Sequence, residues 1–211
     1  MFGISNFETF LIAAILLNLT PGADTMYILG RSISQGKKAG VLSAIGISTG
    51  SLFHCIIAAF GLSIVIAKSA IAFSIIKYLG AAYLIFLGVR ALMTKSRNKF
   101  EVEQMDKKKT SNRKIFVSGI LTNILNPKVA LFFLAFLPQF IDPNFATNSL
   151  PFIILGLTFI TTGTIWCLAL ALFSARLSNR IRKNYKIKTW LDKITGGIFI
   201  ALGIKLALTE K

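Results

Sequence analysis

Two long stretches of this chain contain no charged side chain, and each is long enough to cross a lipid bilayer. The first lies between Lys38 and Lys68, and the second lies between Asp142 and Arg176. A helix that spans the hydrocarbon core needs about 20 mainly apolar residues. Across the whole chain 54% of the residues are hydrophobic and only 15% are charged. The sequence therefore predicts an all-α polytopic membrane protein.

Six apolar stretches fit six transmembrane helices, separated by short polar connections. We expect the helices at about residues 6–30, 40–62 (extending as far as 67), 71–93, 115–137, 151–174 and 190–208. The polar segment "RSISQGKK" after the first helix and the basic segment "ARLSNRIRKNYKIK" after the fifth are expected to be loops.

The net charge of +16 is concentrated in these connections. Nine of the 24 Lys and Arg residues lie from Arg90 to Lys114, and seven lie from Arg176 to Lys193. Lys and Arg are enriched in cytoplasmic loops, where anionic lipid head groups lie. Both termini are therefore predicted on the non-cytoplasmic side. Because the basic runs belong to loops and lack interleaved aromatic residues, the expected partner is the bilayer and not a nucleic acid.

The two halves of the chain resemble each other in sequence. The motif "STGSLF" of residues 48–53 matches "TTGTIW" of residues 161–166, and "FLGVRALMTK" of residues 86–95 matches "ALGIKLALTEK" of residues 201–211. "NLTPGA" in the first predicted helix corresponds to "NILNPKVA" in the fourth. Since each half holds three helices, the second half crosses the membrane in the opposite sense, as in many secondary transporters.

This pattern predicts one transmembrane transporter domain over residues 1–211, built as two inverted three-helix repeats with broken first helices. The first repeat covers about residues 1–95 and the second about residues 115–211. A basic cytoplasmic loop of about residues 94–114 joins them.

A proline interrupts the first predicted helix of each half. Pro21 and Pro127 lack an amide hydrogen, so each leaves the carbonyl four residues earlier, at Leu17 and at Asn123, without its helical donor. Both prolines lie near the middle of a predicted span, where water reaches freed backbone groups only through a cavity. Each of these helices is therefore predicted to consist of two half-helices.

The residues before the two prolines, Thr20 and Asn126, are of types that cap helix N-termini, and proline is favoured at the first helical position. A helix N-terminus attracts a carboxylate, and the free carbonyls of the preceding half-helix attract an ammonium group. Two facing breaks would therefore suit a zwitterionic amino acid. A single proline kink, by contrast, is often structural, and the asparagines alone would suit interhelical packing. The substrate-binding residues predicted on this basis are Asn18, Thr20, Pro21, Gly22, Asp24, Asn123, Asn126, Pro127 and Lys128.

Two ionisable residues, Asp24 and Lys128, lie next to these breaks. Charges inside a membrane are rare and are mostly functional or mutually paired. The helix dipole opposes a cation at the position of Lys128, which therefore needs an anionic partner. That partner is either Asp24, in a structural ion pair, or a substrate carboxylate. The candidates for proton coupling are Asp24 and His54, the only histidine, for which packing between helices is the alternative role.

The blocks "NLTPGADTMYILGRSISQGKKAG", "IKYLGAAYLIFLGVRAL" and "GILTNILNPKVALFFLAFLPQF" resemble the LysE/RhtB family of amino-acid exporters over nearly the whole chain. The resemblance implies a translocator of the bacterial inner membrane, not an enzyme, that exports amino acids such as homoserine, threonine, lysine or leucine. It implies proton antiport with no cofactor other than H⁺, and a homodimer is compatible with it. The family's first block usually reads Pro-Gly-Pro, whereas Ala23 replaces the second proline here.

Two other functions remain open from the sequence. Cys55 and Cys167 lie at nearly corresponding points of the second and fifth helices, which would suit a membrane thiol–disulfide electron carrier. Neither cysteine, however, adjoins a proline break or a charge that would activate its thiol. A metal or cation effluxer is the other alternative, but one His, two Cys and no clustered carboxylates offer few ligands. No metal site is predicted.

Overall fold

The computed structural model describes residues 2–62, 70–93, 110–183 and 185–208, and this part of the chain is helical almost throughout. An antiparallel bridge joins Ile4 to Ile141, and the described residues form no β-strand. The predicted all-α fold is therefore confirmed for this part, and each of the six predicted stretches is helical. In chain order the elements are α1 (Phe7–Leu19), α2 (Ala23–Gln35), α3 (Lys37–Ile56), η1 (Ile57–Leu62), α5 (Ala70–Met93), α6 (Asn112–Ile124), α7 (Pro127–Leu131), η2 (Phe132–Phe136), η3 (Leu137–Phe140), η4 (Pro143–Phe145), α8 (Ser149–Lys183) and α9 (Tyr185–Leu208).

Within the described residues, two helices are long and apolar enough to cross a membrane, and up to four are if each bent pair counts as one span. The two single helices are Lys37–Leu62, which joins α3 to η1, and Ser149–Ser174 within α8. The bent pairs are α1 with α2, at an angle of 46°, and α6 with Pro127–Phe140, at an angle of 48°. Both predicted proline breaks therefore coincide with sharp bends.

Two connections that we expected to be loops are helical instead. Gly36 alone separates α2 from α3, and its φ of 87° is a conformation that glycine adopts without the steric cost of a side chain. α8 continues through the basic segment to Lys183, because Lys and Arg are themselves good helix formers. Of the predicted basic loop, residues 94–109 lie outside the described residues.

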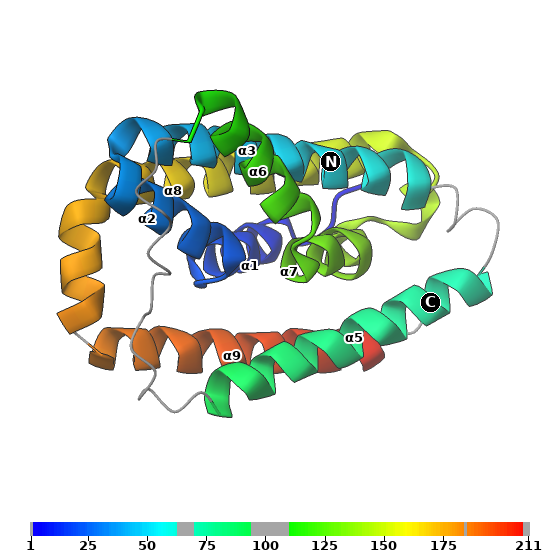
Figure 1. The fold of residues 1–211 in the computed structure, drawn as a ribbon. Helices are drawn as coiled ribbons and strands as arrows, with labels where there is room; N and C mark the ends of the chain where they lie inside the picture. The colour runs from blue at the N-terminus through cyan, green and yellow to red at the C-terminus, as the bar shows by residue number, and fades with distance from the viewer. Residues whose placement is uncertain (1, 63–69, 94–109, 184, 209–211) are drawn as a thin grey trace.

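The helices form two layers (Figure 1). α1, α2, α3, α6, α7 and α8 make the larger layer, and α5 and α9 lie side by side as a separate pair. In this pair the helix backbones approach closely at Gly88 and Gly196. A Cβ added at Gly88 would lie 2.6 Å from the carbonyl oxygen of Gly196. Small residues at such crossings are typical of helices packed in membranes.

The buried hydrophobic residues form two clusters, and the first reaches from the larger layer into α5 and α9 through Ala81, Leu84 and Phe199. The first, which we call the aromatic cluster, contains Phe10, Phe132, Phe133, Phe136, Phe140 and Phe159 together with Cys55. The second, which we call the aliphatic cluster, contains Ile28, Leu29, Ile47, Leu170 and Ala171 together with Tyr27 and Cys167. The rings of Phe132 and Phe159 stack with their centroids 4.4 Å apart.

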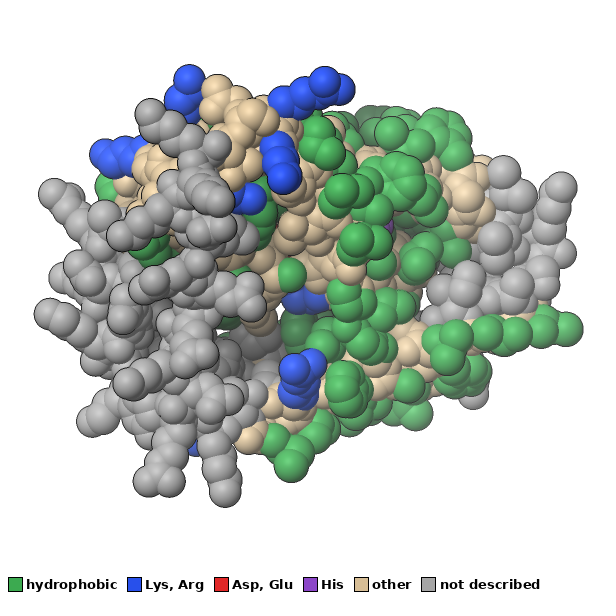
Figure 2. Space-filling view, viewed as in Figure 1, with side chains coloured by type: hydrophobic (Ala, Val, Ile, Leu, Met, Phe, Trp, Pro, Cys, Tyr) green, Lys and Arg blue, Asp and Glu red, His purple; other side chains and the backbone are tan. Residues whose placement is uncertain are grey.

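The outer surface carries many large apolar side chains. Figure 2 shows hydrophobic side chains across much of one face, while most of the Lys and Arg side chains visible on it lie toward one end. Ile12, Phe60 and Ile165, for example, are each more than half exposed. Extended exposed apolar surface is typical of proteins in contact with membranes.

Candidate functional site

The first break, between α1 and α2, consists of Thr20, Pro21 and Gly22. The Thr20 hydroxyl donates to the carbonyl of Leu16 at 2.7 Å, so Thr20 closes the end of α1. The N-cap of α2 is Gly22, and no side chain caps this N-terminus. The prediction that Thr20 caps the second half-helix is therefore wrong, because its hydroxyl bonds back to the preceding turn instead.

The second break, between α6 and α7, agrees with the prediction. Asn126 is the N-cap of α7, and its side chain accepts a hydrogen bond from the backbone amide of Lys128 at 3.1 Å. Pro127 is the first residue of α7. Because Asn126 already occupies the amide of Lys128, that amide is not available to hold a carboxylate.

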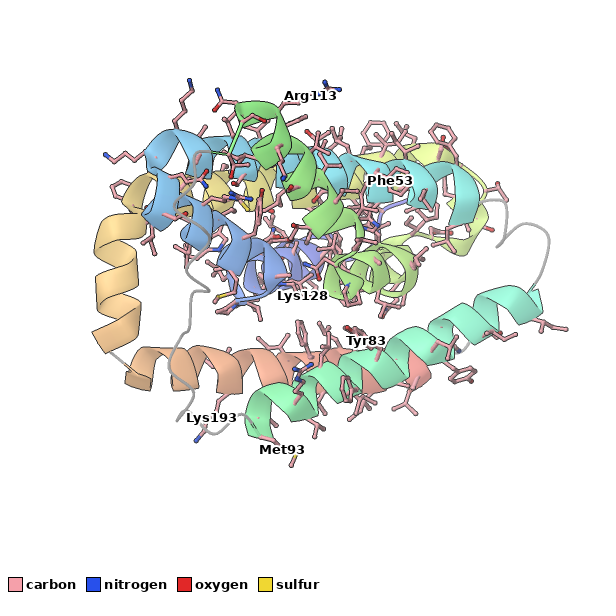
Figure 3. All side chains as sticks on the ribbon, viewed as in Figure 1. Phe53, Tyr83, Met93, Arg113, Lys128 and Lys193 are labelled. Atoms are coloured by element: carbon pink, nitrogen blue, oxygen red, sulfur yellow. The ribbon has the colours of Figure 1, made fainter. Side chains whose placement is uncertain are left out.

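The two carbonyls that the prolines were expected to free both accept hydrogen bonds from other elements. The carbonyl of Leu17 accepts from the Lys128 ammonium at 3.2 Å, and that of Thr20 accepts from the same group at 3.0 Å. The carbonyl of Asn123 accepts from Nε2 of His54 at 3.1 Å. Since a carbonyl only accepts, Nε2 carries the proton in this contact. Figure 3 shows Lys128 on α7, near α1.

Asp24 and Lys128 are not joined to each other by a direct ion pair, although both side chains are described. Oδ2 of Asp24 accepts from the side-chain amide of Asn123 at 2.9 Å. Oδ1 of Asp24 is buried and has no hydrogen-bond partner. The ammonium of Lys128 lies instead against the C-terminal end of α1, where the helix dipole is negative. Backbone carbonyls, and not the expected carboxylate, are thus the partners of the Lys128 ammonium.

Both charged residues line a single buried cavity of about 30 Å³. Such a volume is roughly that of one water molecule. Four of the nine predicted substrate-binding residues, Asn18, Asp24, Asn123 and Lys128, line this cavity, and the other five build the two breaks beside it. The full lining is Asn18, Asp24, Thr25, Ile47, Ser48, Ser51, Asn123, Lys128, Val129, Phe159, Ile160, Gly163, Thr164, Trp166 and Cys167.

His54 does not line the cavity but contacts Asn123, which does. Its ring is buried and stacks on Phe133 with the centroids 5.9 Å apart, and its Nε2 bonds the carbonyl of Asn123. Asn123 in turn holds the Asp24 carboxylate. Both candidates for proton coupling therefore contact the same asparagine.

The polar residues of α3 and α8 in the cavity wall were missed by sequence reasoning. The hydroxyls of Ser48 and Thr164 form a hydrogen bond of 2.7 Å, and the Ser51 hydroxyl donates to Oδ1 of Asn123 at 3.2 Å. The signal was present in "STGS" and "TTGT", because hydroxyl clusters in otherwise apolar helices require partners. From the sequence alone, these motifs indicate only that the two halves of the chain resemble each other.

The glycines of the same two motifs allow the broken helices to approach closely. A Cβ added at Gly50 would lie 2.8 Å from Cβ of Asn123, and one added at Gly163 would lie 3.1 Å from Oδ1 of Asn18. The asparagine of each broken helix therefore packs against the glycine of the matching motif from the other half of the chain.

The two cysteines are both free and buried. Cys55 belongs to the aromatic cluster and faces Gly156, whereas Cys167 belongs to the aliphatic cluster and lines the cavity. They thus lie in separate parts of the core.

Comparisons with known proteins agree with the resemblance seen in the sequence. Residues 15–210 match the family of LysE type translocators. Similar proteins include YrhP of Bacillus subtilis (strain 168), an uncharacterized membrane protein that is 39% identical over 204 residues, which are 94% of this chain and 96% of the relative. Uncharacterized membrane proteins of Vibrio cholerae serotype O1 and Pseudomonas aeruginosa are 31% and 29% identical, over 95% and 97% of this chain and 96% of each relative. No solved structure matches the chain.

The family match includes both breaks and every residue that lines the cavity. It extends across α2, α3, α5, α6, α7 and α8, so it covers nearly all of the described chain. The chain belongs to the LysE type translocator family, whose members are membrane transport proteins.

Proposed function

We propose that this protein exports amino acids from the cytoplasm in exchange for protons, as a secondary transporter of the bacterial inner membrane. The observation that carries the proposal is the placement of Asp24 and Lys128, one from each broken helix, around the same buried cavity. An α-amino acid presents an ammonium group and a carboxylate to these two charges. In a site of low dielectric constant both interactions are strong.

Asp24 accounts for the coupling to protons. Its Oδ1 is buried and unpartnered, so it is free to bind either a proton or the ammonium group of a substrate. The two cannot bind together, because a protonated carboxyl has lost the charge that attracts the ammonium group. Proton entry would thus release the substrate. His54, which reaches Asp24 through Asn123, is the second candidate for carrying the proton.

In this proposal the two bends allow the cavity to open alternately to the two sides of the membrane. The cavity of about 30 Å³ is far smaller than the roughly 300 Å³ or more of ordinary ligand pockets. We propose that it widens when the half-helices change their angles at the breaks, since helix ends beside short connections absorb such changes. The closed cavity would then be an occluded state between inward-open and outward-open forms.

The inverted repeat of two three-helix halves is part of the proposal. It is supported by the reciprocal packing of Asn123 on Gly50 and of Asn18 on Gly163, and by the similar bends of 46° and 48°. The position of most of the visible Lys and Arg side chains toward one end in Figure 2 supports a cytoplasmic position for that end and a non-cytoplasmic position for both termini. The proposal requires no cofactor other than the exchanged proton and no nucleic-acid partner, and it is compatible with a homodimer.

Transport by the purified protein in liposomes tests this function. Liposomes loaded with a mixture of radiolabelled amino acids are diluted into buffers of different pH, and the label that leaves is identified. We expect a pH gradient to drive export of at least one amino acid. Asp24→Asn should reduce gradient-driven export on the order of 100-fold, about 2.7 kcal/mol of lost interaction.

Asp142→Asn is the matched control, because Asp142 lies in the segment between η3 and η4, where its side chain accepts from the amide of Asn144 at 2.8 Å. It should leave export unchanged. Export by Asp24→Asn at the wild-type rate, with the same response to the pH gradient, would show that Asp24 does not couple protons.

A further inference from the structure

The polar side chains around the cavity fall into two groups, those with a protein partner and those without. The side-chain amide of Asn18 donates to the carbonyl of Phe159 at 3.3 Å and to the hydroxyl of Thr162 at 3.1 Å. The side-chain amide of Asn123 donates to Asp24 and accepts from the hydroxyl of Ser51. These asparagines are already engaged, so they serve to hold the walls in place.

Two buried polar atoms of the cavity wall have no hydrogen-bond partner among the described residues. They are Oδ1 of Asp24 and Nε1 of Trp166. An unsatisfied buried polar group destabilises the folded protein, and a buried indole N–H usually has an acceptor. Lys128 adds a third unused position, because only two of its three N–H bonds are directed to carbonyls.

The unused atoms are therefore one anionic acceptor on α2, one neutral donor on α8 and one cationic donor on α7. An ammonium group satisfies the acceptor, and a carboxylate with two oxygens satisfies the two donors. The Lys128 ammonium is already anchored to the end of α1, whereas the indole N–H of Trp166 has no hydrogen-bond acceptor in the part of the chain that the structure describes.

We infer that Trp166 is a specificity-determining residue, whose Nε1–H binds the α-carboxylate of the transported amino acid. This inference rests on the proposed function. A site built to hydrogen-bond a particular group discriminates strongly against analogues that lack it, because its own buried polar atom is then left unpaired. Trp166 thus makes a free α-carboxylate a requirement for tight binding, whatever the side chain of the substrate.

The test compares amino acids with their amides, which keep the ammonium group but lack the carboxylate. Wild-type protein, Trp166→Phe and Trp190→Phe are reconstituted, and export KM values are measured for L-homoserine, L-threonine, L-lysine and L-leucine, each beside its amide. Phe keeps an aromatic ring but removes the N–H. Trp166→Phe should raise KM about tenfold for the transported acids and leave KM for the amides unchanged.

Trp190→Phe is the matched control and should change neither KM, since it replaces the other of the two tryptophans. It also leaves Trp166 as the sole source of tryptophan fluorescence. In this variant the emission should shift when a transported amino acid is added and should not shift with its amide, which keeps the inference testable should Trp166→Phe not fold.

Equal KM changes for acids and amides in Trp166→Phe would overturn the inference, because they would show a general effect on the cavity. An unchanged KM for the acids would do the same. In either case export by the wild type would still stand. If the wild type exports none of the twenty amino acids, the proposed function fails and the role of Trp166 fails with it.

Discussion

The two broken helix pairs bend by nearly the same angle, 46° and 48°, yet their breaks are stabilised in different ways. The break between α6 and α7 is capped from within its own sequence by Asn126 and Pro127. The break between α1 and α2 has no side-chain cap at Gly22, and its carbonyls are instead satisfied by Lys128 from the other half of the chain.

The same bend can therefore arise from local or from tertiary interactions. The second break is specified by adjacent residues, so it should form wherever α6 forms. The first break depends on the docking of α7, and the Lys128 side chain lies close against Gly22. A Cβ there would lie only 3.3 Å from the Lys128 nitrogen.

The largest effect is expected from removing the side chain that connects the two breaks. Lys128→Met should lower the free energy of unfolding by about 3 kcal/mol, because the carbonyl of Thr20 loses a charge-assisted bond and Asp24 loses its neighbouring cation. Export should fall about 100-fold, which corresponds to a free-energy change of about 2.7 kcal/mol. Thermal unfolding in detergent and export from liposomes measure the two effects.

Lys114→Met, in the first turn of α6, is the control for lost charge, since Lys114 is exposed. Combining Lys128→Met with Asp24→Asn should restore part of the lost stability, because no unbalanced buried charge remains. If Lys128→Met unfolds at the same temperature as Lys114→Met, the first break does not depend on Lys128.

A second comparison concerns the two glycines that face the breaks. Gly50→Ala should destabilise the protein by about 2 kcal/mol, because the new methyl group meets Cβ of Asn123 and the backbone carbonyl of Ile120 at 2.8 Å. Gly163→Ala meets only the side-chain amide of Asn18, at 3.1 Å, so a small shift relieves the contact and about 1 kcal/mol or less is expected. Equal shifts in unfolding temperature would contradict this asymmetry.

The smallest effects are expected from the residues that end or begin half-helices. Asn126→Ala removes an N-cap and should cost about 1 kcal/mol, which corresponds to roughly 2–4 °C in unfolding temperature. Thr20→Val removes the bond to the carbonyl of Leu16, which keeps the Thr20 amide as a donor, and should cost about 0.5 kcal/mol. A larger loss of stability in Thr20→Val than in Asn126→Ala would mean that the first break is the locally specified one.

The sequence predicted the breaks themselves because the effect of proline on a helix is local. It removes the amide that would bond one particular carbonyl, and the carbonyls of Leu17 and Asn123 instead accept from the amides of Thr20 and Asn126 and from side chains of other elements. The identity of those donors, Lys128 and His54, could not be predicted. It depends on which helices lie side by side and on how each is rotated about its axis.

Helix ends were predicted less well than helix centres. Long apolar runs indicate all six helical stretches, but the basic segment after Ser174 predicts a loop where α8 in fact continues. The wall residues Ser48 and Trp166 were missed because each, taken alone, is an ordinary helical residue. Only their place around one cavity gives them a role.

The one-residue connection at Gly36 has a mechanical consequence. α2 carries Asp24 near one end and is tied to α3 at the other, and along its length the Tyr27 hydroxyl donates to the carbonyl of Ile115 in α6 at 2.7 Å. A tilt of α2 about the stretch around Pro21 would therefore also displace α3 and α6.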